Sequence, residues 1–141
     1  MKEEIRKKED IKKKEEVVLE SFESENYLET KKDILVKSAK EYYSSGLDEL
    51  NKERFNSSVV LFFKSLVAFV DLYVFQQTGN TPSSHTSRFR ICKEKFLEVY
   101  DLLDKDFPFY QDSCVQIMTK ELAEVIKNDT EIMAEKTKIN L

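Results

Sequence analysis

The chain has 141 residues, and its 27 acidic and 23 basic side chains give a formal charge of −4, which is not the basic balance of most bulk nucleic-acid binders. Ten Phe and six Tyr argue against a disordered chain, and a domain of this length can bury a core without disulfides or metal. Only two Gly and two Pro are present, too few for the turns of hairpins and sandwiches, so we expect an all-α fold of a few long helices.

The first element that we expect is a charged helix. Residues 1–16 contain 13 charged side chains of alternating sign, and Glu and Lys four positions apart can stabilise a helix that has little apolar face. Residues 24–26 resemble a break before the next element. We therefore predict a charged N-terminal helix or extension over residues 1–26 and a helical bundle over residues 27–141. No apolar run follows the charged start, so we expect no signal peptide and a cytoplasmic location.

The second expected helix covers residues 27–52. Its apolar and small residues recur at steps of four or three, which places them on one helical face. These residues are Leu35, Ala39, Tyr42, Gly46 and Leu50. A glycine inside a helix costs about 1 kcal/mol relative to alanine, so Gly46 predicts the close approach of another backbone.

A strongly apolar helix is expected over residues 56–78. Within residues 59–75 only Lys64, Ser65 and Asp71 are polar, and these 17 residues are at the lower limit of length for a membrane span. The two central charges would each cost free energy in lipid. A helix buried inside a bundle or a dimer is therefore the better interpretation, and we expect no membrane partner.

Polar residues of this helix recur every seven positions and form one narrow stripe. They are Ser57, Lys64, Asp71 and Thr78. Either Lys64 and Asp71 line a cleft, or the stripe is the solvent side of an otherwise buried helix. The sequence leaves both interpretations open.

The next loop holds His85, the only histidine. We expect the helix that follows to begin at about Pro82 or Thr86 and to end at Asp104. Thr81 can cap it, with Pro82 in its first turn. His85 would then share an apolar face with Phe89. We expect it to anchor the corner by a hydrogen bond to backbone rather than to perform chemistry.

A second corner is expected at residues 107–109, where Pro108 suits the first turn of the final helix. The apolar face of that helix includes Tyr110, Cys114, Met118, Leu122, Val125 and Met133. No strand candidate, internal repeat or low-complexity linker is present. The predicted architecture is an antiparallel up-and-down bundle of four main helices plus the charged N-terminal helix.

Few residues could support metal or nucleophilic chemistry. Cys92 and Cys114 have no CxxC pairing, so we expect neither a zinc site nor a disulfide, and both are predicted to be buried core residues. The acidic residues Asp101, Asp104 and Asp106 could hold a cation, but surface charge is the simpler interpretation. One histidine cannot supply a di-metal carboxylate site, and two distant glycines cannot form a phosphate loop. No metal or cofactor is predicted.

Basic residues gather at two places in the chain. Lys52 and Arg54 precede the apolar helix. The second set follows the His85 loop and consists of Arg88, Arg90, Lys93 and Lys95. In an antiparallel packing the two sets lie at opposite ends, so they form two patches unless a dimer joins them.

Four short motifs occur in order along the chain. The pattern A-x-x-Y-x-x-x-G-L covers residues 39–47, and R-F-N at residues 54–56 leads into the apolar helix. G-x-x-P-x-S-H covers residues 79–85, and Y-Q-D-S-C covers residues 110–114. In this order and spacing the chain resembles a HEPN domain (higher eukaryotes and prokaryotes nucleotide-binding) over about residues 34–131.

The resemblance implies a four- or five-helix up-and-down bundle, usually a homodimer. Members include toxin ribonucleases, partners of minimal nucleotidyltransferases, and noncatalytic modules that bind nucleic acid or nucleotides. The ribonucleases carry an arginine followed a few residues later by a histidine near the start of the last helix. This chain has Gln111 at the arginine position and no later histidine. RNA cleavage without metal needs a group that exchanges protons and a cation, so we predict that the protein is not an enzyme.

The function that we expect is a noncatalytic HEPN-like module, a homodimer that binds a nucleotide, a nucleic acid or a partner protein. Such a partner would be a minimal nucleotidyltransferase of a toxin–antitoxin-like system. One alternative is an RNA-binding module that uses basic residues at the helix ends, and the other is a divergent ribonuclease that uses His85. The candidate binding residues are Arg54, Lys64, Asp71, His85, Arg88, Arg90 and Lys93.

Overall fold

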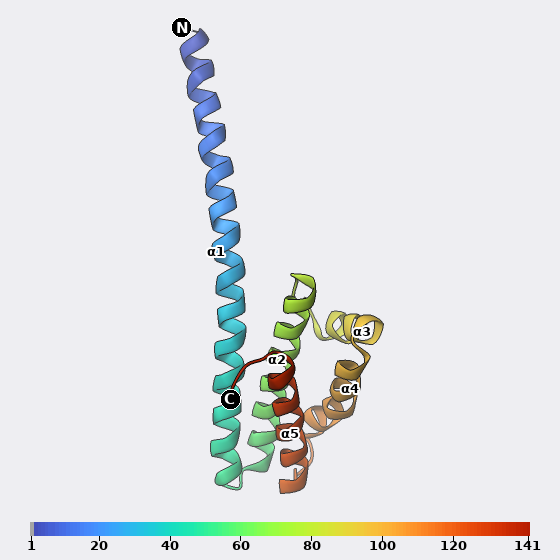
Figure 1. Cartoon of the computed structure of the whole chain (residues 1–141). Coiled ribbons are helices and arrows are strands. Elements are labelled where there is room, and N and C mark those ends of the chain that lie inside the picture. The colour runs from blue at the N-terminus through green and yellow to red at the C-terminus, as the bar shows by residue number, and fades with distance from the viewer. Residues whose placement is uncertain (1) are drawn as a thin grey trace. The chain divides into compact units, whose positions relative to one another are not determined.

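The protein is all-α, as the composition predicts. The computed structural model describes residues 2–141, with side chains described for residues 2–14 and 30–141. Five helices and no strand make up this described chain (Figure 1). The helices are α1 (Lys2–Asn51), α2 (Phe55–Thr78), α3 (His85–Lys95), α4 (Leu97–Asp112) and α5 (Lys120–Lys136).

Helix α1 is continuous, so the break predicted at residues 24–26 is wrong. None of these three residues is Gly or Pro, so nothing in the backbone chemistry stops the helix there. By its contacts the chain divides within α1 into two compact units, Met1–Asp33 and Ile34–Leu141. This division comes later in the chain than the predicted end of the N-terminal extension.

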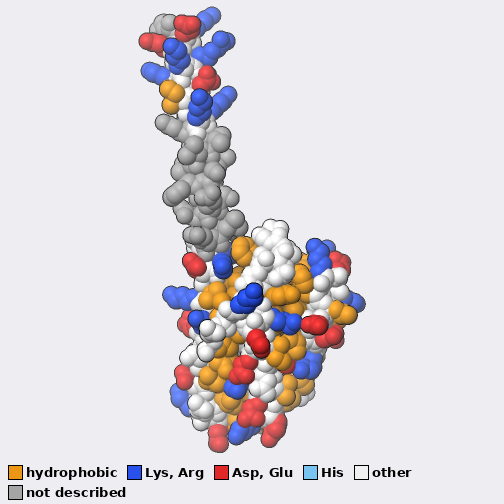
Figure 2. All heavy atoms as spheres, viewed as in Figure 1, with side chains coloured by type: hydrophobic (Ala, Val, Ile, Leu, Met, Phe, Trp, Pro, Cys, Tyr) orange, Lys and Arg blue, Asp and Glu red, His pale blue; other side chains and the backbone are white. Residues whose placement is uncertain are grey.

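The first unit carries acid–base pairs at helical spacing. Side chains 2–14 are all exposed, including Ile5 at 55% and Ile11 at 57%. Acids precede lysines by four positions in the pairs Glu3 and Lys7, Glu4 and Lys8, Glu9 and Lys13, and Asp10 and Lys14. Each pair in this order stabilises a helix by about 0.2–0.5 kcal/mol. Figure 2 shows both signs of charge around this segment, which has the sparse apolar surface that the sequence predicts.

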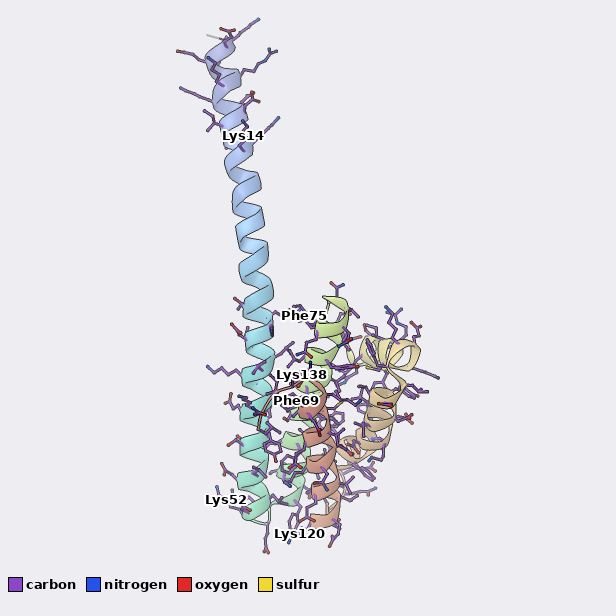
Figure 3. All side chains as sticks on the ribbon, viewed as in Figure 1. Lys14, Lys52, Phe69, Phe75, Lys120 and Lys138 are labelled. Carbon is purple, nitrogen blue, oxygen red and sulfur yellow. The ribbon has the colours of Figure 1, made fainter. Side chains whose placement is uncertain are left out.

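Helix α2 is the core helix of the second unit. Its buried residues include Phe62, Phe63, Leu66 and Phe69, each at most 1% exposed, and it packs against α5 and α4 (Figure 3). By length and composition alone α2 could also cross a membrane. In the fold it is the buried helix that the sequence predicts.

Gly46 lets α1 and α2 approach closely. A Cβ atom at Gly46 would lie 2.7 Å from the ring of Phe62, closer than non-bonded carbon atoms normally come. Nearby, the Ser65 hydroxyl donates a 2.6 Å hydrogen bond to the carbonyl oxygen of Ala39. The close approach predicted at Gly46 is present, but an aromatic ring rather than a backbone fills the space.

Helix α5 is held to α2 and α1 by hydroxyl groups. The Thr130 hydroxyl lies 3.1 Å from the carbonyl oxygen of Phe62 and 2.7 Å from that of Ile126. The Tyr43 hydroxyl donates a 2.6 Å hydrogen bond to Glu131. Burial, followed by the contact with the Glu131 carboxylate, raises the pKa of Tyr43 above its ordinary value. Polar contacts therefore fix the register of α5 on the other helices.

The turn after α2 leads into α3, which begins at His85, close to the later of its two predicted starts. Gly79 ends α2 in the left-handed region at φ 79°, and its N–H bonds a carbonyl oxygen one turn earlier at 2.8 Å. The Ser84 hydroxyl then caps α3 by accepting a 3.1 Å hydrogen bond from the Ser87 amide. Of the two predicted starts, Pro82 is wrong and Thr86 is one residue after the observed start. Several hydroxyl residues in this loop can cap a helix, and capping preference alone does not choose among them.

The single helix predicted to end at Asp104 is two helices. The backbone turns at Phe96, with φ −135° and ψ 66°, so that α3 ends and α4 begins there. Helices α3 and α4 pack against each other. The apolar periodicity continues through the turn, which is why the sequence pattern resembles one helix.

Pro108 lies inside α4, so the corner predicted at residues 107–109 is wrong. Val99, Leu103 and Asp106 form the buried face of α4, and Phe109 and Tyr110 beyond the proline are partly buried against the core. Packing of that face outweighs the hydrogen bond that Pro108 removes. The final helix begins only after Thr119, whose hydroxyl caps it.

Two predictions about exposure are also corrected. Cys92 is buried, as expected, but Cys114 is exposed because it lies in the connection between α4 and α5. Asp101 and Asp104 are exposed, as expected, whereas Asp106 is fully buried.

Candidate functional site

A cavity of about 310 Å³ brings four of the seven predicted binding residues together. These four are Lys64, Asp71, His85 and Arg88. The cavity is also lined by Leu35, Tyr42, Phe63, Val67, Ala68 and Tyr110. Helix α2 supplies Phe63, Lys64 and Asp71, α3 supplies His85 and Arg88, and α1 and α4 supply Tyr42 and Tyr110.

The Asp71 and Arg88 side chains form a two-point ion pair across the cavity. Arg88 Nε donates to Asp71 Oδ1 at 2.7 Å, and Arg88 Nη2 donates to Asp71 Oδ2 at 2.9 Å. The two side chains are only 9% and 14% exposed. A bidentate, partly desolvated pair of this kind fixes the orientation of both groups. The pair therefore positions α3 against α2 and sets the shape of the cavity.

The remaining arm of Arg88 holds His85. Arg88 Nη1 lies 2.9 Å from His85 Nδ1, and because arginine has only donors, Nδ1 is the acceptor. The acceptor role of Nδ1 corresponds to the tautomer that carries its proton on Nε2. The His85 ring also lies 5.7 Å from the ring of Phe107, between centroids. The backbone anchor predicted for His85 is wrong: its side chain is exposed and bonded to the Arg88 side chain.

Lys64 lines the same cavity and has no carboxylate partner in the described part of the chain. Its Nζ lies 5.8 Å from the centroid of the Tyr42 ring, within cation–π range. Behind it, the rings of Phe63 and Tyr110 stack at 4.6 Å. The cavity thus combines an exposed cation with an aromatic floor.

The polar stripe of α2 proves to be divided. Lys64 and Asp71 line the cavity, which is the first of the two interpretations that the sequence leaves open. Thr78 instead bonds the carbonyl oxygen of Val74 in its own helix at 2.8 Å. Ser57 belongs to a different hollow at the other end of α2.

Three predicted binding residues do not line this cavity. Arg54 lies 3.7 Å from Glu49 in an exposed ion pair. Arg90 is exposed on α3. Lys93 Nζ stands 5.7 Å from the centroid of the Tyr100 ring. The sequence predictions missed Tyr42 and Phe63 as cavity residues, although Phe63 precedes Lys64 directly.

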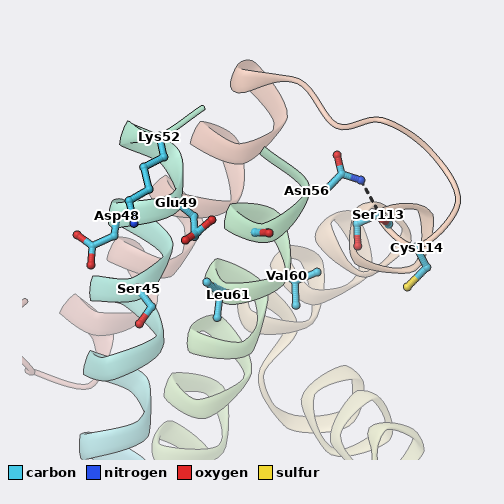
Figure 4. Close-up of a pocket in the computed structure, with 10 residues that line it drawn as sticks. Ser45, Asp48, Glu49, Lys52, Asn56, Val60, Leu61, Ser113 and Cys114 are labelled. Carbon is cyan, nitrogen blue, oxygen red and sulfur yellow. Dashed lines mark hydrogen bonds between the residues drawn. The ribbon is translucent and has the colours of Figure 1, made fainter. Parts of the chain in front are cut away.

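A second, larger hollow of about 580 Å³ lies where α1 ends and α2 begins (Figure 4). It is lined by Ser45, Asp48, Glu49, Lys52, Asn56, Ser57, Val60, Leu61, Ser113 and Cys114. Two acidic residues face one lysine, so the hollow is less suited to a phosphate than the cavity at Lys64. Its rim carries Cys114 and is held by Asn56.

Asn56 ties the start of α2 to the connection between α4 and α5. Its amide group donates to the carbonyl oxygens of Ser113 at 2.9 Å and Gln116 at 2.7 Å. Its side-chain oxygen accepts a 2.9 Å hydrogen bond from the Met118 amide. The first of these bonds is drawn in Figure 4. One side chain thereby organises six residues of irregular backbone.

No metal centre is evident among the described residues, which contain no group of three or more His, Cys, Asp or Glu side chains placed to hold an ion. Cys92 lies near the Asp71 and Arg88 pair but is buried. Burial first, and then the Asp71 charge, raise the pKa of Cys92 to about 11, with Arg88 opposing the rise. Cys92 is therefore a protonated thiol near neutral pH.

Comparison with known proteins gives no assignment. The chain matches no family model, and no curated protein or solved structure shows significant similarity to it. The HEPN resemblance rests on the sequence motifs, and the function must be argued from the cavity.

Proposed function

We propose that the chain is a noncatalytic HEPN-like binding module that takes a nucleotide in the cavity formed by Lys64, Asp71, His85 and Arg88. The single observation that supports this proposal is the convergence of these four residues with aromatic rings in one hollow. The finer architecture, an up-and-down HEPN-type bundle, and the homodimeric state are parts of the same proposal.

The charge of the cavity favours an anionic ligand. Lys64 and Arg88 contribute +2 and Asp71 contributes −1, so the lining has a net charge of +1. Because Asp71 already neutralises Arg88, Lys64 is the residue available to a phosphate. The volume of about 310 Å³ is at the lower end of the range for small-molecule sites. A mononucleotide is therefore a better candidate than a folded RNA.

The partly exposed aromatic side chains of the cavity favour a ligand that carries a nucleobase. Tyr42 and Tyr110 line the cavity and are partly exposed. A nucleobase stacked on an aromatic side chain gains about 1–3 kcal/mol with little dependence on its identity. Stacking and one phosphate contact together describe a nucleotide.

The arrangement of His85 supports the noncatalytic part of the proposal. A general base needs an unprotonated nitrogen that can reach the substrate. Nδ1 of His85 accepts a hydrogen bond from Arg88, which leaves Nε2 as the nitrogen that carries the proton. In this arrangement no nitrogen of the ring is free to take a proton.

Exposed apolar residues support a protein contact as well. Val115 is 80% exposed and Ile117 is 92% exposed, both in the connection that Asn56 holds. Side chains of this kind suit a second copy or a nucleotidyltransferase partner. Light scattering at micromolar concentration should give a dimer, and a strictly monomeric protein would remove the homodimer from the proposal.

Isothermal titration calorimetry with nucleoside mono-, di- and triphosphates tests the binding function. A charged phosphate contact contributes about 1.5–3 kcal/mol, so Lys64→Met should weaken binding by roughly 10- to 100-fold. Lys40→Met removes an exposed lysine outside the cavity and should leave binding unchanged. Absence of nucleotide binding, or equal binding by both variants, would contradict the proposal.

A cleavage assay on single-stranded RNA separates the alternatives. The proposal expects no cleavage by the protein. Cleavage that is lost in His85→Ala would instead establish the divergent ribonuclease. Salt-dependent RNA binding that is lost on substituting Arg54, Arg90 and Lys93, with no nucleotide binding, would establish the RNA-binding module.

A further inference from the structure

A pair of buried carboxyl groups lies between α4 and α5, away from the candidate cavity. Asp106 of α4 is 0% exposed, and neither of its oxygens has a hydrogen-bond partner among the described residues. Asp129 of α5 is 5% exposed. Lys105 Nζ lies 2.8 Å from Asp129 Oδ2, close enough for an ion pair although not aligned as a hydrogen bond.

Two ionised carboxylates are unfavourable at this position. A buried carboxylate without donors loses its hydration and gains nothing in exchange, and a second one nearby adds repulsion. Lys105 supplies one positive charge, which balances one carboxylate only. A proton on Asp106 removes the second charge and provides an O–H donor, which is what the unpartnered oxygens lack.

We propose that Asp106 and Asp129 share one proton as a carboxylic acid–carboxylate hydrogen bond that ties α4 to α5, and that release of this proton to solvent loosens the junction as the pH rises. Asp106 is the acid and donates, Asp129 is the carboxylate and accepts, and Lys105 neutralises the charge that remains. The junction is a proton-dependent latch between two helices. This inference does not depend on what the cavity binds.

The charged surroundings of Asp106 agree with this assignment. Two charged groups affect the pKa of Asp106: the Asp129 carboxylate on α5 and the Lys105 ammonium group on α4. The two charged residues of α2 and Arg88 of α3 line the candidate cavity instead, and the other charged side chains of α3 are exposed. Burial first, then the hydrogen bond and charge of Asp129, raise the pKa of Asp106 to about 8, against an opposing effect of Lys105.

The direction in which stability changes with pH follows from the pKa of Asp106 in the folded and the unfolded chain. The unfolded chain has an ordinary Asp106 pKa of 3.8 and the folded chain one of about 8, so the folded state holds an extra proton between these values. Stability from this group is fully present below about pH 4 and is lost as the pH rises to about 8. The lowered pKa values of Glu98 and Glu131 act below 4.5, and the raised pKa of Cys92 acts above 9.0, so neither overlaps the pKa shift of Asp106.

Urea unfolding followed by circular dichroism from pH 5 to pH 9 tests the latch. For the wild-type protein the unfolding constant should rise about tenfold per pH unit between pH 5 and pH 7, because one proton is released on unfolding. Asp106→Asn has no proton to release and keeps an amide donor for Asp129, so this rise should disappear. Asp104→Asn, an exposed aspartate on the same helix, should behave like the wild type. The same pH dependence in wild type and Asp106→Asn would overturn the proposal.

A direct titration keeps the test valid if Asp106→Asn does not fold. Carboxyl carbons of aspartate can be followed by NMR in the wild-type protein labelled with ¹³C-aspartate, with Asp104→Asn used to assign one exposed signal. One aspartate should titrate near pH 8, far above the others. If every aspartate titrates near its ordinary value, the shared proton does not exist.

Discussion

Arg88 holds Asp71 across the space between α2 and α3 with two of its nitrogen atoms, at 2.7 Å and 2.9 Å. The third nitrogen meets His85 at 2.9 Å, so one guanidinium joins residues from the middle of α2 and the first turn of α3. All three residues line the candidate cavity. Recognition of a ligand there therefore depends on a pair that also supports the fold.

Removal of Asp71 should destabilise the protein strongly. Asp71→Ala leaves the Arg88 charge nearly buried and unpaired, which should lower the free energy of unfolding by about 3 kcal/mol in urea denaturation. The double variant Asp71→Leu with Arg88→Met should lose less, because no uncompensated charge remains. Arg54→Ala breaks an exposed pair and should cost less than about 0.5 kcal/mol. Equal losses from Asp71→Ala and Arg54→Ala would contradict this account.

A methyl group at Gly46 should also destabilise the fold. Gly46→Ala places a Cβ atom 2.7 Å from the Phe62 ring, in a core where the ring cannot move aside. The overpacking cost exceeds the helix-propensity gain of about 1 kcal/mol, so a net loss of roughly 1–2 kcal/mol is expected on thermal or urea unfolding. Phe62→Leu added to Gly46→Ala should recover part of that loss. The control is Ser44→Ala at an exposed site of the same helix, which should be neutral or slightly stabilising; a stabilised Gly46→Ala protein would refute the clash.

The two cysteines should differ sharply in reactivity. Cys114 is exposed, whereas Cys92 is buried with its pKa raised to about 11. Because the thiolate is the reactive form, a disulfide reagent at pH 8 should modify one thiol rapidly in the native protein and the second only after denaturation. Cys114→Ser should abolish the fast phase, and Cys92→Ser should retain it. Rapid reaction of both thiols in the native state would show that the α2–α3 region opens readily.

Loss of the Asn56 side chain should loosen the connection between α4 and α5. Asn56→Ala removes three hydrogen bonds and leaves the Met118 amide without its partner. We expect faster hydrogen exchange at Met118 and a loss of about 1–3 kcal/mol in the free energy of unfolding. Ser57→Ala, at the exposed neighbouring position, should change neither quantity. Unchanged exchange at Met118 would mean that the backbone holds its conformation without Asn56.

Periodicity predicts the helices of this protein better than their ends. The apolar run of residues 59–75 marks α2 correctly, because burial on several sides leaves few polar positions. The cap at Ser84 and the position of Pro108 inside α4 are not predictable in the same way, since several residues can cap and packing can outweigh the cost of a proline. Tertiary contacts decide those details.

Local sequence patterns predict only part of the candidate site. Lys64 and Asp71 are seven apart on one helix, so their shared face is predictable. The meeting of Asp71 with Arg88 depends on how α3 docks after an irregular loop, which no spacing rule gives. The burial of Asp106 does have a signal: it continues the steps of four and three from Val99 and Leu103, so its position is that of a core residue despite its charge.

The pairing of α2 with α5 has a consequence for synthesis of the chain. The Thr130 hydroxyl donates to the carbonyl oxygen of Phe62, 68 residues earlier in the chain. The face of α2 that α5 covers is therefore synthesised long before α5. While the ribosome adds those residues, α2, which carries Phe62, Leu66 and Phe69, has no α5 to pack against. The nascent chain therefore presents an aggregation-prone surface until α5 emerges, and efficient production should depend on chaperones that shield apolar segments during translation.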